Sequence, residues 1–158
     1  SNRVDDLING YDCSGGFPCT SSNVNKATIK GVSLTGSTVL AGTTLRGNVN
    51  WQDPRDDITD KRLTYRSEWY GTLDVSRPFD QLTLGSTLRV AGSRYADSGN
   101  TKELGGYALV DLYADYALNP TTRLFARVNN AFDRDYTQLA GYNTAGREWL
   151  VGVNWQPK

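Results

Sequence analysis

The closing stretch of the chain, Gly146 to Lys158, reads GREWLVGVNWQPK and is the part of the sequence that decides the fold class. Two tryptophans and two valines alternate in it with a mixed set of residues: Trp149, Val151, Val153 and Trp155 with Glu148, Leu150, Gly152 and Asn154. Alternate side chains of a strand share a face. The stretch therefore predicts a strand with one apolar face, which would favour aggregation in water but suits contact with lipid.

Composition supports an all-β protein and excludes several functions. The 158 residues have zero formal net charge, nine Tyr, four Trp and sixteen Gly, with no His and no Met. Aromatic residues suit strands, whereas a nucleic-acid partner normally requires a basic surface. Without His the chain lacks the commonest metal ligand and general base, and it has no nucleophile elbow or phosphate loop. We therefore predict no enzyme, no catalytic residue, no cofactor and no metal.

Membrane residence would have to rely on strands. No run approaches the roughly 18 consecutive apolar residues of a transmembrane helix, and no basic-then-apolar signal segment opens the chain. The absence of such a signal segment is expected of a mature protein or of a fragment.

The two cysteines, Cys13 and Cys19, lie in the Gly- and Ser-rich stretch YDCSGGFPCTSS. Their closeness on a flexible loop predicts a small disulfide in an oxidising compartment. Free thiols or half of a metal site are the alternatives.

Segments with a period of two residues, bounded by Gly, Pro, Asn and Asp, fill most of the chain. Several match the roughly 9 to 11 residues with which a tilted strand crosses a bilayer. We predict eight strands: Arg3–Ile8, Asn25–Leu40, Thr44–Gln52, Arg62–Arg77, Gln81–Tyr95, Tyr107–Leu118, Thr122–Phe132 and Glu148–Gln156.

The connections between these segments alternate in length. Tight turns are predicted at Ala41–Thr43, Pro78–Asp80 and Asn119–Thr121, and longer loops at Asn9–Asn23, Asp53–Lys61, Ala96–Gly106 and Asp133–Arg147. Outer-membrane barrels have tight periplasmic turns and longer extracellular loops. The pattern predicts antiparallel transmembrane β-barrel strands with a periplasmic C-terminus.

The two faces of the strands differ in the way a barrel requires. One face carries Leu63, Tyr65, Trp69, Leu73, Val75, Leu82, Leu84, Leu88, Val90, Ala108, Val110, Leu112, Ala114, Tyr116, Leu118, Leu124, Ala126 and Val128. The other carries Arg62, Arg66, Glu68, Asp74, Arg89, Asp111, Asp115, Arg123 and Arg127. Opposite charges on one face can pair across strands. A soluble β-sandwich binding module is the alternative explanation of the alternation.

The first segment is short. Only about six residues precede Asn9-Gly10, fewer than a bilayer crossing needs, and unpaired backbone in lipid is costly. A larger barrel interrupted within a strand is therefore preferred to a complete eight-stranded barrel with a structural or adhesion role.

Three stretches resemble the TonB-dependent outer-membrane transporters. The closing hairpin of these transporters is similar to the stretch VNNAFDRDYTQLAGYNTAGREWLVGVNW. Another strand of the family is similar to the stretch NVNKATIKGVSLTG, in which Ser33 stands where Glu is commoner. RVDDLI precedes the first loop. The form GYNTAGRE resembles members that import vitamin B12 (cobalamin) more than members that import ferric siderophores.

This resemblance implies a 22-stranded barrel with an N-terminal plug inside it and a TonB box. Residues 1–158 would be the C-terminal part of that barrel, with the plug and the TonB box absent. The expected location is the outer membrane of a Gram-negative bacterium, with extracellular loops. The expected partners are membrane lipid, the remainder of the barrel and plug, TonB, and a large scarce nutrient, either cobalamin or a siderophore.

Substrate contacts are expected at the edges of the loops, where aromatic faces and amides can grip a large substrate. The candidates are Tyr95, Tyr136, Tyr142, Asn143 and Arg147. Arg147 could instead pair with a carboxylate. A structural role is expected for the family-like motif, which comprises Asn130, Phe132, Asp133, Asp135 and Tyr136.

The acidic stretch DPRDDITDK contains Asp53, Asp56, Asp57 and Asp60. It lacks the spacing of an EF-hand. A solvated extracellular loop is therefore expected rather than a Ca²⁺ site.

Overall fold

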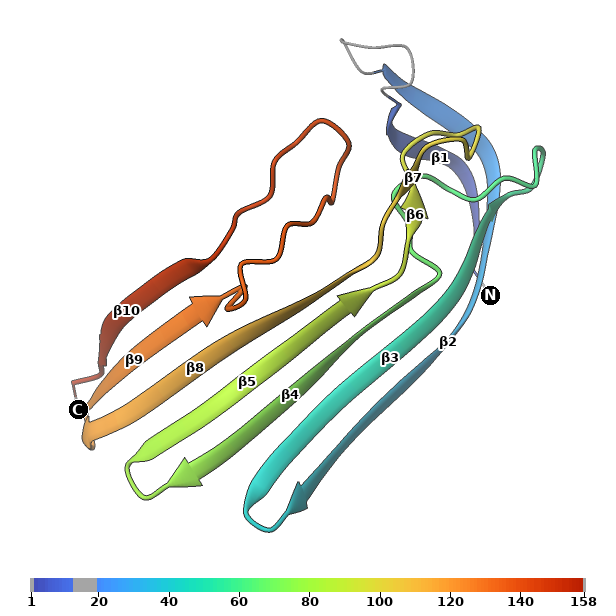
Figure 1. Ribbon diagram of the computed structural model, residues 1–158. Helices are drawn as coiled ribbons and strands as arrows, with labels where there is room; N and C mark the ends of the chain where they lie inside the picture. The colour runs from blue at the N-terminus through green and yellow to red at the C-terminus, as the bar shows by residue number, and fades with distance from the viewer. Residues whose placement is uncertain (1, 13–19, 158) are drawn as a thin grey trace.

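The structure is a computed structural model that describes the backbone of residues 2–12 and 20–157 and the side chains of residues 26–157. Its main feature is one antiparallel sheet of eight strands in the order β1-β2-β3-β4-β5-β8-β9-β10 (Figure 1). The strands are β1 (Asn2–Asp12), β2 (Thr20–Leu40), β3 (Thr43–Asp56), β4 (Trp69–Phe79), β5 (Leu82–Ala91), β8 (Tyr107–Asn119), β9 (Thr122–Asn129) and β10 (Glu148–Trp155). The all-β, antiparallel prediction is confirmed.

Tight turns gather at one end of the sheet and long connections at the other (Figure 1). Ala41 and Gly42 both have positive φ and join β2 to β3, as a two-residue hairpin turn requires. At the opposite end, a small hairpin of β6 (Arg94–Tyr95) and β7 (Glu103–Leu104) forms part of the connection between β5 and β8. No helix suited to crossing a membrane occurs in the part of the chain that the structure describes.

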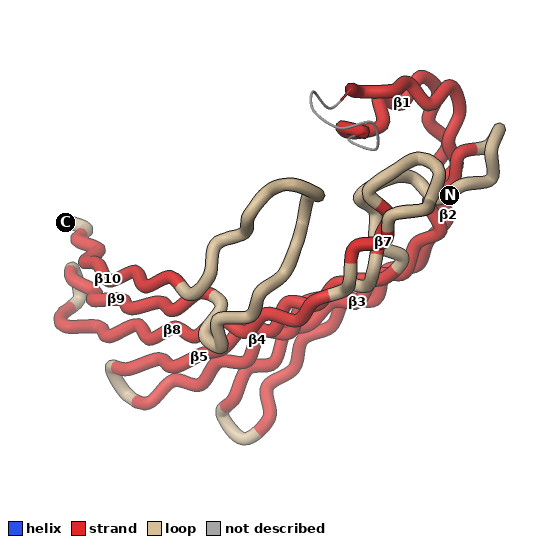
Figure 2. The backbone as a smooth tube through the Cα atoms, turned by 45° about the horizontal axis from the view of Figure 1, so that its top comes forward, coloured by secondary structure: helices blue, strands red, loops and turns tan. Residues whose placement is uncertain are grey.

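The sheet is a curved wall that does not close on itself (Figure 2). Strands β1 and β10 form its two edges, and no pairing joins them within the described residues. Strand β1 pairs with the loop-side half of β2, from Asn2 opposite Ile29 to Asp12 opposite Thr20. The remainder of β2, from Lys30 to Leu40, has β3 as its neighbour. Much of both edges therefore offers unpaired backbone groups.

One face of the sheet is an apolar belt that follows the pairing register. Leu88 lies between Leu73 and Val110, and Ala126 lies opposite Val151. We define the apolar belt by the residues Val32, Leu34, Val49, Leu73, Leu88, Val110, Leu112, Ala126, Val151 and Val153. Its exposed members include Val151, with 77% of its surface accessible, and Val32, with 68%. A continuous exposed apolar surface marks an interface, here one suited to lipid.

The opposite face is polar and carries the predicted cross-strand pairs. Arg89 Nη2 lies 2.9 Å from Asp111 Oδ2 on the neighbouring strand. Thr87 donates a hydrogen bond of 2.9 Å to Asp74, and the Tyr113 hydroxyl donates one of 3.2 Å to the same carboxylate. The prediction that neighbouring charges pair on this face is therefore confirmed for Arg89 and Asp111.

The predicted strand Arg62–Arg77 is wrong in its first part, because β4 begins at Trp69. Arg62 forms an isolated bridge with Arg55, and Tyr65 has φ of 57°, which interrupts an extended backbone. Leu63 is buried against Ala27, with Ile29 packed beside it. Leu63 and Tyr65 therefore belong to the loop-side structure and not to the apolar face that the sequence predicted.

Other boundaries also differ from the prediction. Strand β2 begins at Thr20 and not at Asn25, and β3 continues to Asp56 and does not end at Gln52, so Asp53 to Asp56 lie in a strand and not in the predicted loop. Strand β1 continues through Asn9-Gly10 to Asp12 by means of a register shift between Asn9 and Tyr11, so the argument from a six-residue strand is wrong. Strand β5 ends before Gly92, where a Cβ would lie 2.6 Å from Trp69 Nε1. Strand β9 ends before Asn130, which has φ of 49°.

Gly71 allows close approach of β3 and β4. A Cβ at this position would lie 2.5 Å from the backbone oxygen of Asn48 and 3.3 Å from Val49 Cα, so a side chain would have to push the strands apart. We expect Gly71→Ala to lower the free energy of unfolding by about 1–3 kcal/mol, measured by denaturant titration in detergent. Gly36→Ala is the control because its Cβ would meet nothing within 4 Å. Equal stability of the two variants would contradict the register.

Candidate ligand-binding cavity at the loop end of the sheet

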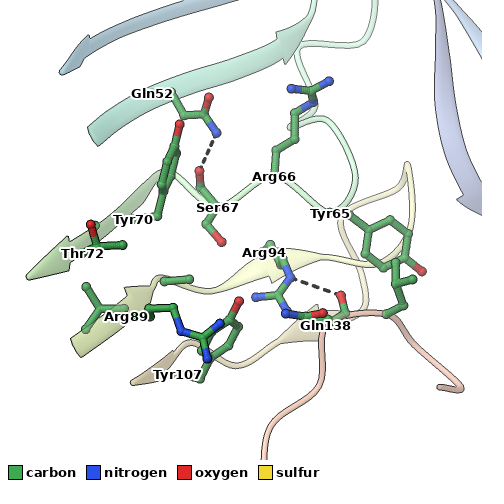
Figure 3. Close-up of a pocket in the computed structure, with 14 residues that line it drawn as sticks. Gln52, Tyr65, Arg66, Ser67, Tyr70, Thr72, Arg89, Arg94, Tyr107 and Gln138 are labelled. Carbon is green, nitrogen blue, oxygen red and sulfur yellow. Dashed lines mark hydrogen bonds between the residues drawn. The ribbon is translucent and has the colours of Figure 1, made fainter. Parts of the chain in front are cut away.

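A cavity of about 590 Å³ lies on the polar face where β3, β4, β5 and β8 meet the loops (Figure 3). We call it the wall cavity and define it by Gln52, Arg66, Tyr70, Arg89, Arg94 and Tyr107. Gln52 Nε2 donates a hydrogen bond of 2.8 Å to the Ser67 carbonyl oxygen, which fixes the start of β4 against β3. The cavity has polar groups on several sides and aromatic rings suited to a large polar ligand.

Arg94 is the buried centre of this region, with 6% of its surface exposed. Its Nε donates to the Gln138 carbonyl oxygen at 3.4 Å and its Nη2 donates to the Thr137 carbonyl oxygen. Its Cζ lies 5.3 Å from the centre of the Tyr107 ring, a cation–π distance. Arg94 thus joins the connection that contains β6 to the loop between β9 and β10.

The charge of the wall cavity is positive. Arg66, Arg89 and Arg94 line it, and none of its lining residues is acidic. Arg89 pairs with Asp111 outside the lining, whereas Arg66 and Arg94 have no ion pair among the described side chains. Arg94 Nη1 is buried and has no hydrogen-bond partner there. A buried guanidinium nitrogen without an acceptor is costly.

The loop between β9 and β10 is fixed at its base by the family-like motif. The backbone N–H of Asn130 donates to Asp111 Oδ1 at 2.9 Å, and Asn130 exchanges two hydrogen bonds with the backbone of Arg134. Asp133 Oδ1 accepts a hydrogen bond of 2.8 Å from the N–H of Arg147. These contacts give Asn130 and Asp133 the structural role expected from the sequence.

Comparison with known proteins identifies the family. The family model described as TonB dependent receptor-like, beta-barrel matches residues 1–131. The chain belongs to the TonB-dependent receptors. Vitamin B12 transporter BtuB of Vibrio vulnificus is 27% identical over 98% of this chain and 26% of its own length. Its namesake from Photobacterium profundum is 32% identical over 85% of this chain and 22% of its own length.

Solved structures share the fold of this receptor chain. Copper transporter OprC matches with a TM-score of 0.76 at 20% identity, over 97% of this chain and 26% of that one. The siderophore receptor PiuA from Acinetobacter baumannii matches with a TM-score of 0.73 at 20% identity, over 97% and 25% of the two chains. The chain thus spans about a quarter of its relatives. These relatives are named as transporters and receptors.

None of the five predicted substrate residues lines the wall cavity. Tyr95 is in β6, with Arg62 Cζ at 6.0 Å from its ring, and the Tyr136 ring lies 4.8 Å from that of Tyr107. Tyr142 and Asn143 are exposed in the last loop. Arg147 Nη2 lies 3.7 Å from Asp133 Oδ2, so it has a carboxylate partner. Their contacts with substrate stay predictions.

Two other predictions concern the loops. The disulfide predicted for Cys13 and Cys19 lies outside the described residues. In the acidic stretch, the carboxylates have partners within the protein. Asp53 and Asp60 form ion pairs with Arg55. Asp56 accepts hydrogen bonds from the N–H groups of Ile58 and Thr59, and Asp57 accepts one from the Thr28 hydroxyl.

Sequence reasoning missed the residues that form the wall cavity. The sequence pattern indicates Arg66 and Arg89 only as members of the polar face, and it assigns Arg94 and Tyr107 to strand segments without a further role. A usable signal was present, because Arg89, Arg94 and Tyr107 all lie next to the ends of strands that precede or follow a long loop. Side chains at the loop ends of neighbouring strands meet in space whatever their separation in sequence.

Asp97 holds the loop between β6 and β7 by hydrogen bonds that favour its ionised form. Burial alone would raise its pKa, but bonds from the N–H groups of Thr101 and Lys102 and from the Thr101 hydroxyl outweigh burial and lower the pKa below the usual 3.8. A lowered folded-state pKa stabilises the loop above pH 3.8 and loses this contribution as pH falls through the folded-state pKa.

We therefore expect the hydrogen-exchange protection of the Thr101 and Lys102 amides, corrected for intrinsic exchange, to decrease as the pH is lowered below 3.8. Asp97→Asn should weaken the protection of these two amides at neutral pH by about 1–3 kcal/mol. In this variant the protection should no longer depend on pH in the acidic range. Identical pH profiles in the two proteins would refute the role of Asp97.

Proposed function

We propose that residues 1–158 are the C-terminal barrel portion of an active transporter that imports a large scarce nutrient across the bacterial outer membrane. The observation that carries this proposal is an eight-stranded wall with an exposed apolar belt and two open edges, in a chain that spans about a quarter of its transporter relatives. In lipid, unpaired strand edges require further strands. The remainder of the barrel would supply them.

The proposed orientation follows the two ends of the sheet. Tight turns and the C-terminal end of β10 lie at one end, and the long connections lie at the other (Figure 1). In outer-membrane barrels the first end is periplasmic and the second extracellular. We assign the apolar belt to lipid and the polar face to the barrel interior and its plug. TonB would act on the N-terminal portion of the receptor.

The substrate proposed first is cobalamin, and the alternative is a ferric siderophore. Cobalamin is supported by the two curated relatives named vitamin B12 transporters, which align with 98% and 85% of this chain. A siderophore is supported by solved structures of similar fold, including the siderophore receptor PiuA. In either case the wall cavity, beside the outer loops, would form part of the binding mouth.

Uptake by whole cells tests this function. A strain that relies on the full-length receptor is supplied with labelled cyanocobalamin or with a labelled ferric siderophore, with TonB present or deleted. We expect uptake of one substrate, and loss of that uptake without TonB. Uptake that is independent of TonB, or absent for both substrate classes while the receptor is present in the outer membrane, would contradict the proposal.

A further inference from the structure

A groove of about 530 Å³ lies in the apolar belt, in the half of β2 and β3 that is nearer the tight turns. We call it the belt groove and define it by Leu34, Gly36, Thr38, Leu45, Gly47 and Val49. These residues pair row by row across β2 and β3, with Gly36 opposite Gly47, so they share one face. Leu73 of β4 lies opposite Gly47 and closes one side. The floor of the groove is therefore a pair of glycines framed by mainly apolar side chains.

The described part of the sheet does not require glycine at these two positions. A Cβ at Gly36 would meet nothing within 4 Å, and a Cβ at Gly47 would make ordinary contacts of 3.5 Å with Leu73 and Thr72. Glycine inside a strand weakens the strand and commonly marks a bulge, a bend or the close approach of a ligand. The pairing of β2 with β3 has no register shift, and this half of both strands is straight in Figure 1. The glycines therefore indicate a ligand that approaches from outside the chain.

An arginine lies on the same face, nearer the tight turns. Arg77 of β4 shares the face of Val75, which lies opposite Leu45 of the groove. From the row of Trp51 and Trp69 to the tight turns, Arg77 is the one charged residue that the described strands place on this face. It is exposed and forms no ion pair among the described side chains. The apolar surface thus ends in a positive charge that can accept an anionic partner.

The distance between Arg77 and the groove fits a lipid. The Arg77 Cζ lies 5.2 Å from the centre of the Phe79 ring, a cation–π contact that holds the charge at the level of the tight turn. Arg77 is four residues from Leu73 along β4, which corresponds to about 13 Å of strand. This length is less than half of the roughly 30 Å hydrocarbon core of a bilayer. A charged group on Arg77 and an apolar chain in the belt groove can therefore belong to one lipid of one leaflet.

We propose that the belt groove and Arg77 form a binding site for an anionic phospholipid of the periplasmic leaflet. Its phosphate lies on Arg77, and one acyl chain lies over Gly36 and Gly47. The inference rests on the proposed function and its barrel orientation, and it adds a specific lipid partner. A guanidinium suits phosphate because it donates two parallel hydrogen bonds. A second copy of this chain fits less well, because the apolar belt contains no carboxylate that could pair with Arg77.

Native mass spectrometry of the full-length receptor in detergent tests the site. The probe is dioleoyl phosphatidylglycerol, and dioleoyl phosphatidylcholine is the comparison lipid without net charge. We expect the wild type to bind one phosphatidylglycerol more tightly than phosphatidylcholine. Arg77→Gln should weaken this binding by about tenfold, the effect of one charge-assisted hydrogen bond, and Arg77→Lys should retain most of it. Gly36→Leu fills the groove and should also weaken binding by about tenfold.

Two variants control for the lost charge and for the added apolar side chain. Arg46→Gln removes an arginine that is adjacent to Gly47 in sequence, but Arg46 lies opposite Asp74 on the polar face. Ala126→Leu enlarges a side chain of the apolar belt outside the belt groove. Each control should change the affinity for phosphatidylglycerol less than twofold. Heat-modifiable gel mobility checks that every variant is folded, and Arg77→Gln carries the test if Gly36→Leu does not fold.

Several results would overturn the site. These are unchanged affinity in Arg77→Gln, losses in the two controls equal to those in the site variants, and equal binding of the two phospholipids by the wild type. Tighter binding of lipid A, which belongs to the outer leaflet, would overturn the assignment to the periplasmic leaflet. A lipid-free receptor dimer that Gly36→Leu converts to a monomer would identify a second copy as the occupant and refute the lipid.

The failure of this inference can be distinguished from failure of the transport function. Lipid binding is measured without substrate, whereas transport is measured as TonB-dependent uptake. Unchanged lipid binding in the site variants together with TonB-dependent uptake by the wild type would remove only the lipid site. Absence of uptake, with the expected losses of lipid binding in Arg77→Gln and Gly36→Leu, would remove the transport function and support the lipid site.

Discussion

Val151→Arg in β10 is expected to destabilise the membrane-inserted receptor by about 2–4 kcal/mol, the cost of an arginine on the lipid face of a barrel near the bilayer centre. Val151 lies in the apolar belt, with 77% of its surface exposed and Ala126 opposite it. Chemical unfolding of the receptor in lipid vesicles measures the loss. The large effect at an exposed position follows only if lipid covers that position.

Leu150→Arg provides the matched control on the adjacent residue. Leu150 is also exposed but points to the polar face, where its register partner is Arg127. In the barrel this change should cost less than about 1 kcal/mol apart from local repulsion between the two arginines, which salt weakens. In a sheet surrounded by water both substitutions would be tolerated alike. Equal stabilities of the two variants would therefore refute the assignment of the belt to lipid.

Arg94→Met is expected to release the loop between β9 and β10 from the wall. The variant loses the two donated bonds to Thr137 and Gln138, each worth about 1.5 kcal/mol or more for a charged donor, and the contact with Tyr107. The loop should dock about 3 kcal/mol less strongly. Limited proteolysis should then cut between residues 134 and 146 faster than in the wild type, while the strands stay resistant.

Arg134→Met is the control for this second prediction. Arg134 lies in the same loop, is exposed, and its side chain forms no ion pair among the described residues. Cleavage in this variant should match the wild type. Wild-type resistance in Arg94→Met would show that other contacts hold the loop and that Arg94 is not its anchor.

The fold was predictable wherever neighbouring residues alone determine the backbone. Alternation in β10 and the turn at Ala41-Gly42 predicted a strand and a hairpin, and the structure has both. The prediction failed at residues 62–68, where alternating side chains resemble a strand. There Leu63 packs against Ala27 and Tyr65 adopts positive φ, so contacts distant in sequence outweigh the local pattern.

The candidate site was less predictable because its residues come from separate elements. Arg94 and Gln138 are 44 positions apart, and nothing local to either indicates that they bond. The sequence directed attention to tyrosines at loop edges, and one of these, Tyr136, does contact Tyr107 beside the wall cavity. The positive cavity itself depends on the register of four strands, which alternation alone does not specify.

Assembly of the barrel tests the central claim that these strands are part of a larger wall. Residues 1–158 are expressed alone and together with the N-terminal portion of the receptor, and each sample is folded into detergent. Gel mobility in cold SDS is then compared with mobility after heating. The account predicts a compact, heat-modifiable species only when both portions are present, because the open edges of β1, β2 and β10 need partners. A compact, heat-modifiable monomer formed by residues 1–158 alone would contradict it.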